Sequence, residues 1–434
     1  MSGRKNTPPV ARPTGLRRVI ELGKDLLIVA LACSAVFLAA QTPIATHLRG
    51  WVAPEPPPAA TRTSLAVNPY AIAIRNDKGL YSVSYDQAPV ERAFERFSPL
   101  LGEAFSAAQL PETATRAQWQ ALLEAPGVCC TFQGQPPLSA LSAWLGGGED
   151  YPGEAHTLLL AWDGRQMWLA WRVGDSYFRA RTSVAYQGHL ADALADFSPN
   201  GAAYAYTLSD DDAYEALDPY VLISITAPQP HVYTAASPDL MADEEARSAL
   251  LTALGFLSGT EGAYETADGL AVTESGDRLL VTSAGEVTFR AGDESRYPMT
   301  LERALPSAYT AAQAAWEVLD RAISPFRGEG DFILTGARQT DAGWEVTFHV
   351  MLEGVPVLTA GEGWSARFLV EGGRISEFAL ALRTYTATET VTTLPTPRLA
   401  AAALRSLPSR GGQLVLCYSD NRAATLTAGW MTGE

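Results

Sequence analysis

The side chains best suited to chemistry are spread along the 434-residue chain without forming a catalytic pattern. No H-E-x-x-H, G-x-S-x-G, S-x-x-K, Walker or G-x-G-x-x-G pattern surrounds a histidine or a candidate nucleophile. The five histidines are isolated in sequence: His47, His156, His189, His231 and His349. Because distant residues can meet in a fold, missing motifs weaken an enzymatic interpretation without excluding it. We expect no catalytic residue, no cofactor and no metal site.

Carboxylates and tryptophans leave two alternatives open. Glu345 and Glu353 could supply the acid and base of a hydrolase that modifies the cell wall, although carboxylates on amphipathic strands are usually solvated. A ligand-binding sensor could instead stack wall fragments on Trp162, Trp168 and Trp171. Tryptophans on neighbouring strands more often pack in a core, so we expect that role here.

Two short runs resemble ion-binding loops only in composition. Asp210, Asp211 and Asp212 lack the alternating ligands and the glycine of a calcium loop. We expect them to begin a helix before Tyr214, because aspartate is a good helix cap. The three glycines of residues 146–148 precede no helix and no lysine that could hold a phosphate, so they indicate a plain loop.

The four cysteines do not form the framework of a disulfide-rich protein. Cys129 and Cys130 are adjacent and could bridge only through a strained ring, so we expect both to be reduced and buried. A bridge from either one to Cys417 stays open at this stage. A zinc site is poorly supported, because the pair lacks a two-residue spacer and a nearby histidine.

An apolar run near the N-terminus predicts a membrane anchor. Residues 26–40 are fifteen consecutive apolar residues, and a span needs about 20, so the predicted transmembrane helix covers residues 26–45. Six basic and two acidic side chains precede the run, and few basic residues follow it. This asymmetry places residues 1–25 in the cytoplasm and the bulk of the chain outside it.

Two processing signals are alternatives to this anchor. Cleavage by a signal peptidase after Ala40 or Ala39 would leave Leu38 or Phe37 where a small residue is needed. Lipid attachment at Cys33 would follow a very short apolar run and leave an apolar stretch after the cysteine. Both fit the sequence less well than an uncleaved helix.

Small residues four positions apart occur twice within the predicted span. Ala30 with Ser34, and Ala35 with Ala39, each form a patch that would let a second helix approach closely. Such pairs also arise by chance in alanine-rich helices. We predict these four residues as contacts with a partner helix.

Composition predicts a folded and acidic portion after the anchor. Hydrophobic residues make up 47% of the chain and charged residues 18%, as in globular proteins. Residues 1–25 have a surplus of four positive charges, so the formal net charge of −16 leaves about −20 for the remainder. An acidic surface repels phosphate backbones, and nucleic acid is therefore not an expected partner.

The length suggests two or three domains after the anchor. Residues 46–64 are rich in proline and predict an extended stalk. The domains that we expect after the stalk are residues 65–232, 233–295 and 296–434. In the first, an amphipathic helix over residues 90–108 should be kinked or split at Pro99.

The middle and C-terminal parts share one order of elements. A helix over residues 238–257 precedes short antiparallel strands, and a helix over residues 309–323 precedes strands that alternate apolar and polar residues. Such alternation indicates a sheet with one face in water and one face covered by helices. The predicted class is α+β, with helices packed on antiparallel sheets and a repeated helix-plus-meander unit.

This layout resembles the YycH and YycI family, and YycH more closely than YycI. The likeness covers most of the chain after Leu65. The stretches that carry it are residues 69–74, 79–86, 254–256, 264–269, 285–289, 347–348 and 354–357. The chain departs from the family in its long cytoplasmic tail, which contains proline, and in its polar-edged anchor.

The family consists of paired single-span proteins that regulate the YycG (WalK) sensor kinase of Gram-positive bacteria. The resemblance therefore implies a non-enzymatic membrane protein whose partners are a sensor histidine kinase and a companion single-span protein. It implies contacts through the transmembrane helix and through extracytoplasmic surfaces.

The charge asymmetry generates a prediction of topology. A reporter attached at Gly3 should be cytoplasmic, and one attached at Glu434 should be outside, because basic residues before the span stay in the cytoplasm. Protease protection in spheroplasts measures both positions. Reversed labelling, or release of a shortened protein into the medium, would contradict the predicted anchor.

Overall fold

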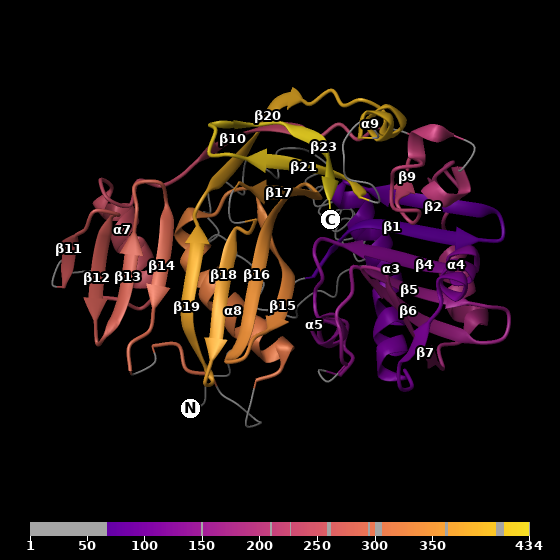
Figure 1. Cartoon of the computed structure of the whole chain (residues 1–434), viewed down its shortest axis with the longest axis horizontal. Coiled ribbons are helices and arrows are strands. Elements are labelled where there is room, and N and C mark those ends of the chain that lie inside the picture. The colour runs from indigo at the N-terminus through magenta and orange to yellow at the C-terminus, as the bar shows by residue number, and fades with distance from the viewer. Residues whose placement is uncertain are drawn as a thin grey trace, which may run out of the picture. The chain divides into compact units, whose positions relative to one another are not determined.

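The computed structural model describes residues 67–148, 151–208, 211–225, 227–257, 262–293, 296–299, 306–360, 363–404 and 412–433. Residues 64–434 form one compact unit, in which helices pack on antiparallel sheets (Figure 1). This arrangement confirms the predicted α+β class with helices and several antiparallel sheets. The predicted tail, span and stalk lie outside the described residues.

Seven strands form the first sheet, in the order β2-β1-β4-β5-β6-β7-β3, and all neighbours are antiparallel. The strands are β1 (Pro69–Asn76), β2 (Gly79–Ser84), β3 (Glu112–Ala114), β4 (Gly127–Phe132), β5 (Thr157–Trp162), β6 (Met167–Val173) and β7 (Ser176–Thr182). The Asn76 carboxamide accepts hydrogen bonds from the backbone N–H groups of Lys78 and Gly79, which stabilises the turn between β1 and β2.

Both faces of this sheet are covered. On one face, Ile74 packs in one hydrophobic cluster with Phe97 and Leu101 of α3 (Gln87–Ser106). On the other face, Cys129 packs with Trp119 of α4 (Arg116–Glu124), whose first turn is stabilised by a capping box at Thr115. The remaining helices of this region are α5 (Leu138–Trp144) and α6 (Ala191–Ala195).

Helix α3 continues through Pro99, so it is not split there, and the alternative of a kink stays a prediction. Proline has no N–H group and leaves the carbonyl oxygen of Glu95 without its usual intrahelical donor. The Ser98 hydroxyl donates a hydrogen bond to that oxygen at 3.2 Å. This local replacement, together with burial of Phe97 and Leu101, keeps the helix in one piece.

Eleven strands form the second sheet, in the order β11-β12-β13-β14-β19-β18-β16-β17-β21-β23, with β15 paired to β16. They are β11 (Ala263–Glu265), β12 (Leu270–Glu274), β13 (Asp277–Val281), β14 (Glu286–Arg290), β15 (Asp331–Gln339), β16 (Gly343–Leu352), β17 (Val355–Thr359), β18 (Ala366–Glu371), β19 (Arg374–Ala381), β21 (Gln413–Asp420) and β23 (Ala428–Gly433). All pairs are antiparallel except β17 with β21.

Helices α7 (Glu244–Ala253) and α8 (Ala308–Ile323) share a hydrophobic cluster with one face of this sheet. The same cluster includes core residues of the first sheet, and α5 contacts α8. A helix followed by antiparallel strands therefore occurs twice, as predicted. The predicted boundaries after residues 232 and 295 stay predictions, but β14 and β19 lie on either side of the second boundary and are hydrogen-bonded neighbours.

Helix α7 is shorter than the predicted helix over residues 238–257. Asp239 accepts hydrogen bonds from the backbone N–H groups of Met241 and Ala242 in a turn, and Asp243 caps the helix by accepting from Ala246. At the other end Gly255 adopts φ +75°, a left-handed conformation that terminates helices. Capping chemistry at both ends thus overrides the apolar spacing that suggested a longer helix.

A small three-stranded sheet was not predicted. It consists of β20 (Thr384–Val391), β10 (His231–Ala236) and β22 (Thr425–Leu426), in that order. Strands β10 and β20 are about 150 residues apart in sequence, and both are rich in threonine and alanine. Helix α9 (Pro397–Leu404) follows β20.

Candidate interaction site

Along β13, β14 and β19 the second sheet leaves one face open to water. Along β13, β14 and β19, Leu279, Phe289 and Phe378 are buried and belong to the cluster that includes α7 and α8. Because side chains alternate along a strand, their neighbours face away from these helices. These outward residues include Arg278, Leu280, Thr288, Arg290, Glu377 and Ala379, and we call this surface the open face.

The open face contains a hollow of about 400 Å³. It is lined by Arg278, Leu280, Thr288, Phe289, Arg290, Arg367, Leu369, Glu377, Phe378 and Ala379, and we call it the open-face hollow. Thr288 lies directly opposite Ala379 on the next strand, so two short side chains form its floor. Longer side chains rise around them, including those of Arg278, Arg290 and Arg367.

Two carboxylates on the open face form ion pairs with arginines. Arg290 pairs with Glu377 at 2.9 Å, and Arg367 lies 3.4 Å from Glu345. Glu345 also accepts from Arg338 at 2.8 Å, so it lies between two arginines. This carboxylate is a structural ion-pair partner.

Glu345 and Glu353 do not form a catalytic pair. Glu345 lies near the start of β16 and Glu353 in the turn after that strand, which corresponds to a separation of about 25 Å along an extended chain. Glu353 instead lies 2.7 Å from Nδ1 of His231. The two residues named for a hydrolase therefore lie in different environments, each with a basic neighbour.

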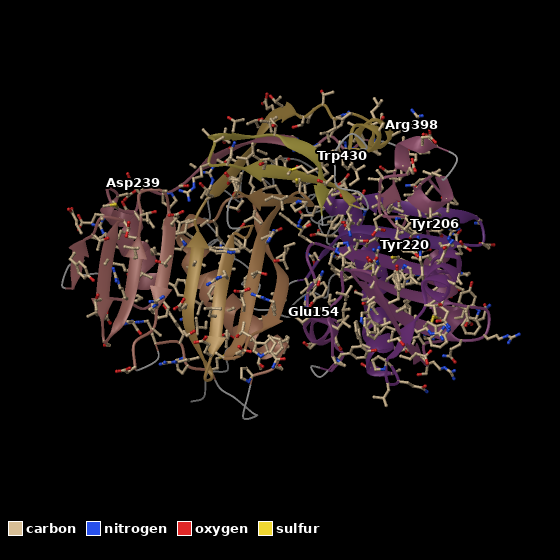
Figure 2. The ribbon with its side chains drawn as sticks, viewed as in Figure 1. Glu154, Tyr206, Tyr220, Asp239, Arg398 and Trp430 are labelled. Atoms are coloured by element: carbon tan, nitrogen blue, oxygen red, sulfur yellow. The ribbon has the colours of Figure 1, made fainter. Side chains whose placement is uncertain are left out.

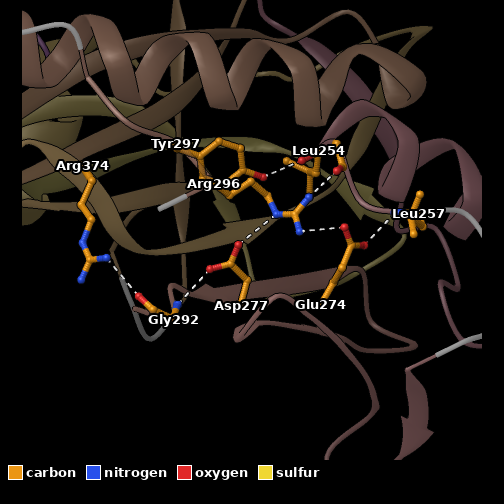
Figure 3. Close-up of polar contacts among 9 residues, drawn as sticks. Leu254, Leu257, Glu274, Asp277, Gly292, Arg296, Tyr297 and Arg374 are labelled. Carbon is orange, nitrogen blue, oxygen red and sulfur yellow. Dashed lines mark hydrogen bonds and ion pairs between the residues drawn. The ribbon is translucent and has the colours of Figure 1, made fainter. Parts of the chain in front are cut away.

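A largely buried arginine, Arg296, joins the end of α7 to the strands that follow it (Figure 3). Arg296 forms ion pairs with Glu274 at 3.1 Å and Asp277 at 3.0 Å, donates to the carbonyl of Gly255, and stacks over the Phe256 ring at 3.9 Å. These contacts join the end of α7 to the hairpin of β12 and β13. We call this group the Arg296 clamp.

The clamp extends to the next turn of the chain. The second oxygen of Asp277 accepts a hydrogen bond from the backbone of Gly292 at 2.8 Å, and Arg374 donates to the Gly292 carbonyl at 3.0 Å. The Tyr297 hydroxyl donates to Leu254 at 2.8 Å, and burial raises the pKa of this tyrosine. Asp277 is 2% exposed, so its oxygens are satisfied by these protein partners. The sequence did not indicate this group, because its members are far apart in sequence and meet only in the folded chain.

A second buried arginine lies beside the first sheet. Arg172 on β6 forms a two-pronged ion pair with Asp218, and both residues are buried. Its guanidinium lies 5.0 Å from the centre of the Tyr220 ring. Tyr206 packs edge-on against Tyr220 at 5.9 Å, and both are labelled in Figure 2. An arginine inside the apolar stretch of β6 is the sequence signal that could have indicated this buried pair.

The described cysteines are buried thiols without disulfides. Cys129 and Cys130 point to opposite faces of the first sheet and belong to different hydrophobic clusters. Burial raises the pKa of Cys129 to about 12 and that of Cys417 to about 11. The prediction of a reduced, buried pair is confirmed, and neither thiol bridges Cys417.

His156 and His349 are neutral structural residues at neutral pH. Burial lowers the pKa of His156, whose ring nitrogens contact the Gly134 carbonyl at 3.1 Å and the Gln413 side chain at 2.8 Å. Burial lowers the pKa of His349 to about 4, and its Nδ1 atom has no hydrogen-bond partner among the described residues.

Tryptophans and aspartates also occupy structural positions. Trp168 and Trp171 are buried, and Trp162 is half-buried against Tyr186. Asp211 caps a short helical turn by accepting from Ala213, as expected, and it also pairs with Arg398 of α9, which Figure 2 labels. In the part of the chain that the structure describes, no group of histidine, cysteine or acidic residues is arranged to hold a metal ion.

The predicted partner-helix contacts Ala30, Ser34, Ala35 and Ala39 lie outside the described residues. Among the helices between Val67 and Gly433 that the structure describes, none is long and apolar enough to cross a membrane. The predicted span therefore stays a prediction.

The architecture defines a class: a mixed α+β fold in which helices pack against two large antiparallel sheets that share a core. The crystal structure of YycH from Bacillus subtilis has this fold, with a TM-score of 0.50 and 12% sequence identity. The match covers 84% of this chain and 93% of that one. No family model and no curated protein matches the sequence. At this identity the likeness establishes a YycH-like fold, and it confirms the resemblance at that level.

The Arg296 clamp generates a stability prediction. Replacing Asp277 by Ala should lower the free energy of unfolding by about 1–3 kcal/mol, because it removes one of the two carboxylates that pair with Arg296 and leaves the Gly292 N–H without its acceptor. Urea unfolding of a fragment beginning at Leu65 would measure this change. The exposed Asp293, replaced by Ala, is the control and should change it by about 0.5 kcal/mol or less. Equal effects of the two replacements would contradict the role of the clamp.

Burial of His349 predicts a pH dependence of stability. Its pKa is near 6.5 in the unfolded chain and about 4 in the folded protein, so only the unfolded state gains a proton between these values. The free energy of unfolding should therefore fall by about 1–3 kcal/mol as pH decreases from 6.5 to 4. The variant His349→Gln should show a smaller decrease in urea unfolding over the same range. An unchanged slope in this variant would contradict the assignment.

Proposed function

We propose that this protein is a non-catalytic, membrane-anchored regulator of a sensor histidine kinase in the cell envelope. The observation that supports this most is the YycH-like fold over 84% of the chain. YycH and YycI, which the sequence resembles, regulate the YycG kinase as a pair. The partners of this protein are accordingly a sensor histidine kinase and a companion single-span membrane protein.

The proposed arrangement places the described part of the chain outside the cytoplasm. The basic tail of residues 1–25 and the apolar run after it support a single span with a cytoplasmic N-terminus. In this arrangement the helix contacts a partner inside the membrane, and the folded part contacts partners outside. The protein is therefore a single-pass protein of the cell membrane.

The chemistry of the described residues supports regulation over the two alternatives. A hydrolase built on Glu345 and Glu353 would need both carboxylates at one bond, but they lie toward opposite ends of β16. A sensor that stacks wall fragments would need exposed tryptophan rings, but Trp168 and Trp171 are buried. An extracytoplasmic ligand-binding or cell-wall-modifying role would need other residues than those named.

Within the membrane, close packing is the main source of helix association. Ala30, Ser34, Ala35 and Ala39 are small enough to let a partner helix approach, and Ser34 could donate a hydrogen bond across the contact. On a helix the Ala30–Ser34 patch and the Ala35–Ala39 patch lie about 140° apart. We place the intramembrane contact with the kinase or the companion protein at these two patches, and we call the Ala30–Ser34 patch the stripe.

Enlarging the stripe should break the contact. The double variant Ala30→Leu, Ser34→Leu should reduce co-purification of the kinase at least tenfold, because the larger side chains keep the backbones apart. The measurement is pull-down of the intact protein from solubilised membranes, followed by identification of the kinases that co-purify. Expression and the folding of residues 65–434 should not change.

A matched control uses a side of the same helix that neither pair of small residues occupies. Val36→Leu with Ala40→Leu adds side-chain volume roughly 100–120° around the helix from the centre of each pair and should leave co-purification intact. Removal of residues 65–434 should weaken binding without eliminating it. Normal binding by the Ala30→Leu, Ser34→Leu variant, with none by the truncated anchor, would place the contact outside the membrane. If no sensor kinase co-purifies with the intact protein, the proposed function is wrong.

A further inference from the structure

The open-face hollow concentrates positive charge on an acidic protein. Arg278, Arg290 and Arg367 line it, and Glu377 is the one carboxylate among its lining residues. The complete chain has a formal net charge of −16. A local excess of arginine therefore distinguishes this hollow from the average surface of the molecule.

Two of these arginines oppose each other in the sheet. Arg278 on β13 lies directly opposite Arg290 on β14, an arrangement in which like charges destabilise a strand pair. Arg290 pairs with Glu377, whereas Arg278 forms no ion pair with any residue that the structure describes. A bound carboxylate would offset this repulsion.

Arg278 cannot be neutralised by the carboxylate next to it in sequence. Asp277 points to the other side of the strand, where it is committed to Arg296 and to the Gly292 backbone. The Arg296 clamp thus holds β13 in a register that presents Arg278 to solvent. The exposed position of this arginine is a consequence of the fold.

The floor of the hollow is mostly apolar. Leu280, Leu369 and Ala379 are half-buried lining residues, and Thr288 lies between Leu280 and Ala379 in the strand pairing with a single hydroxyl. Small inorganic anions bind where several N–H groups converge, and an apolar floor offers them none. A peptide segment fits better, because an apolar side chain can cover the leucines while neighbouring carboxylates reach the guanidinium groups.

We infer that the open-face hollow binds an acidic segment of a protein partner, in which an apolar side chain lies between carboxylates. The identity of that partner as the kinase or its companion rests on the proposed function. The binding of an acidic segment at the hollow does not rest on the proposed function. Guanidinium groups form two-pronged hydrogen bonds with carboxylates, so Arg278 would hold one acidic side chain of the segment and Arg290, directly opposite it, would attract another. Arg367 already lies next to Glu345 and would contribute less.

The test uses the full chain in detergent and a defined peptide. The probe is a fluorescein-labelled heptapeptide with a central leucine flanked by glutamates, and its counterpart carries glutamines instead. Fluorescence anisotropy should show binding of the glutamate peptide, at least tenfold tighter than the glutamine peptide and weaker at high salt. Equal binding of the two peptides, or no binding of either, would overturn the inference.

Charge reversal locates the site. Arg278→Glu with Arg290→Glu should weaken binding of the glutamate peptide about tenfold or more, because two attractive charges become repulsive. Arg92→Glu, an exposed arginine of α3 outside the hollow, is the matched control and should have little effect. Equal loss in both variants would indicate a general charge effect and overturn the assignment to the hollow.

Co-purification separates this inference from the proposed function. If the intact protein captures a kinase or its companion, the Arg278→Glu, Arg290→Glu variant should capture less of it, and undiminished capture would overturn the role of the hollow in that contact. If no kinase is captured while the peptide still binds at the arginines, the proposed function fails and the binding chemistry of the hollow stands.

Discussion

The pairing of β14 with β19 is the constraint on which the second sheet depends. Five residue pairs join the strands that follow α7 to the strands that follow α8. On the core face Phe289 stacks on Phe378 at 4.9 Å, and on the open face Thr288 lies opposite Ala379. Because side chains alternate, a slip of β14 by one residue would expose Phe289 and bury Thr288. The core and the open-face hollow are therefore specified by the same register.

Two largely buried arginines connect segments at the edges of the two large sheets. Arg296 ties the end of α7 to β12 and β13, and Arg172 ties β6 to Asp218 in the segment before β9 (Leu222–Ile223). Removing an arginine from water is costly, and the mutual attraction of a pair often only balances that cost. These arginines contribute mainly to the specificity of the packing, because each guanidinium needs several acceptors at once. Alternative packings of these segments would leave a charge unpaired.

Local chemistry accounts for the parts of the fold that the sequence could predict. The apolar spacing within α8 acts between residues a few positions apart, and this helix was predicted. The turn at Asn76 and the cap at Thr115 depend on equally local chemistry. The pairing of β10 with β20 was missed, because it joins segments about 150 residues apart whose small and hydroxyl-bearing side chains give no strong alternation. The start of α7 was missed because Asp239 and Asp243 are equally good caps in sequence, and the fold uses Asp243 for the helix.

The same distinction applies to the candidate site. A sequence shows that Arg278 and Arg290 lie on short alternating segments, but not that they are directly opposite each other. Nor does it show that Asp277 is turned away from Arg278 and committed to Arg296. The excess charge of the open-face hollow arises from these two tertiary facts. Motif searches miss such a surface, because it contains no fixed spacing of reactive residues.

A weak contact at the hollow would be sufficient for a membrane-anchored regulator. Exposed arginine–carboxylate pairs contribute little free energy each, and they affect specificity and association rate more than affinity. Two proteins held in one membrane by their spans meet at a high effective concentration, so a second contact adds avidity without needing to be tight alone. The small residues in the span and the arginine-rich hollow outside would then have different roles. The helix would supply proximity, and the hollow would select an acidic partner surface.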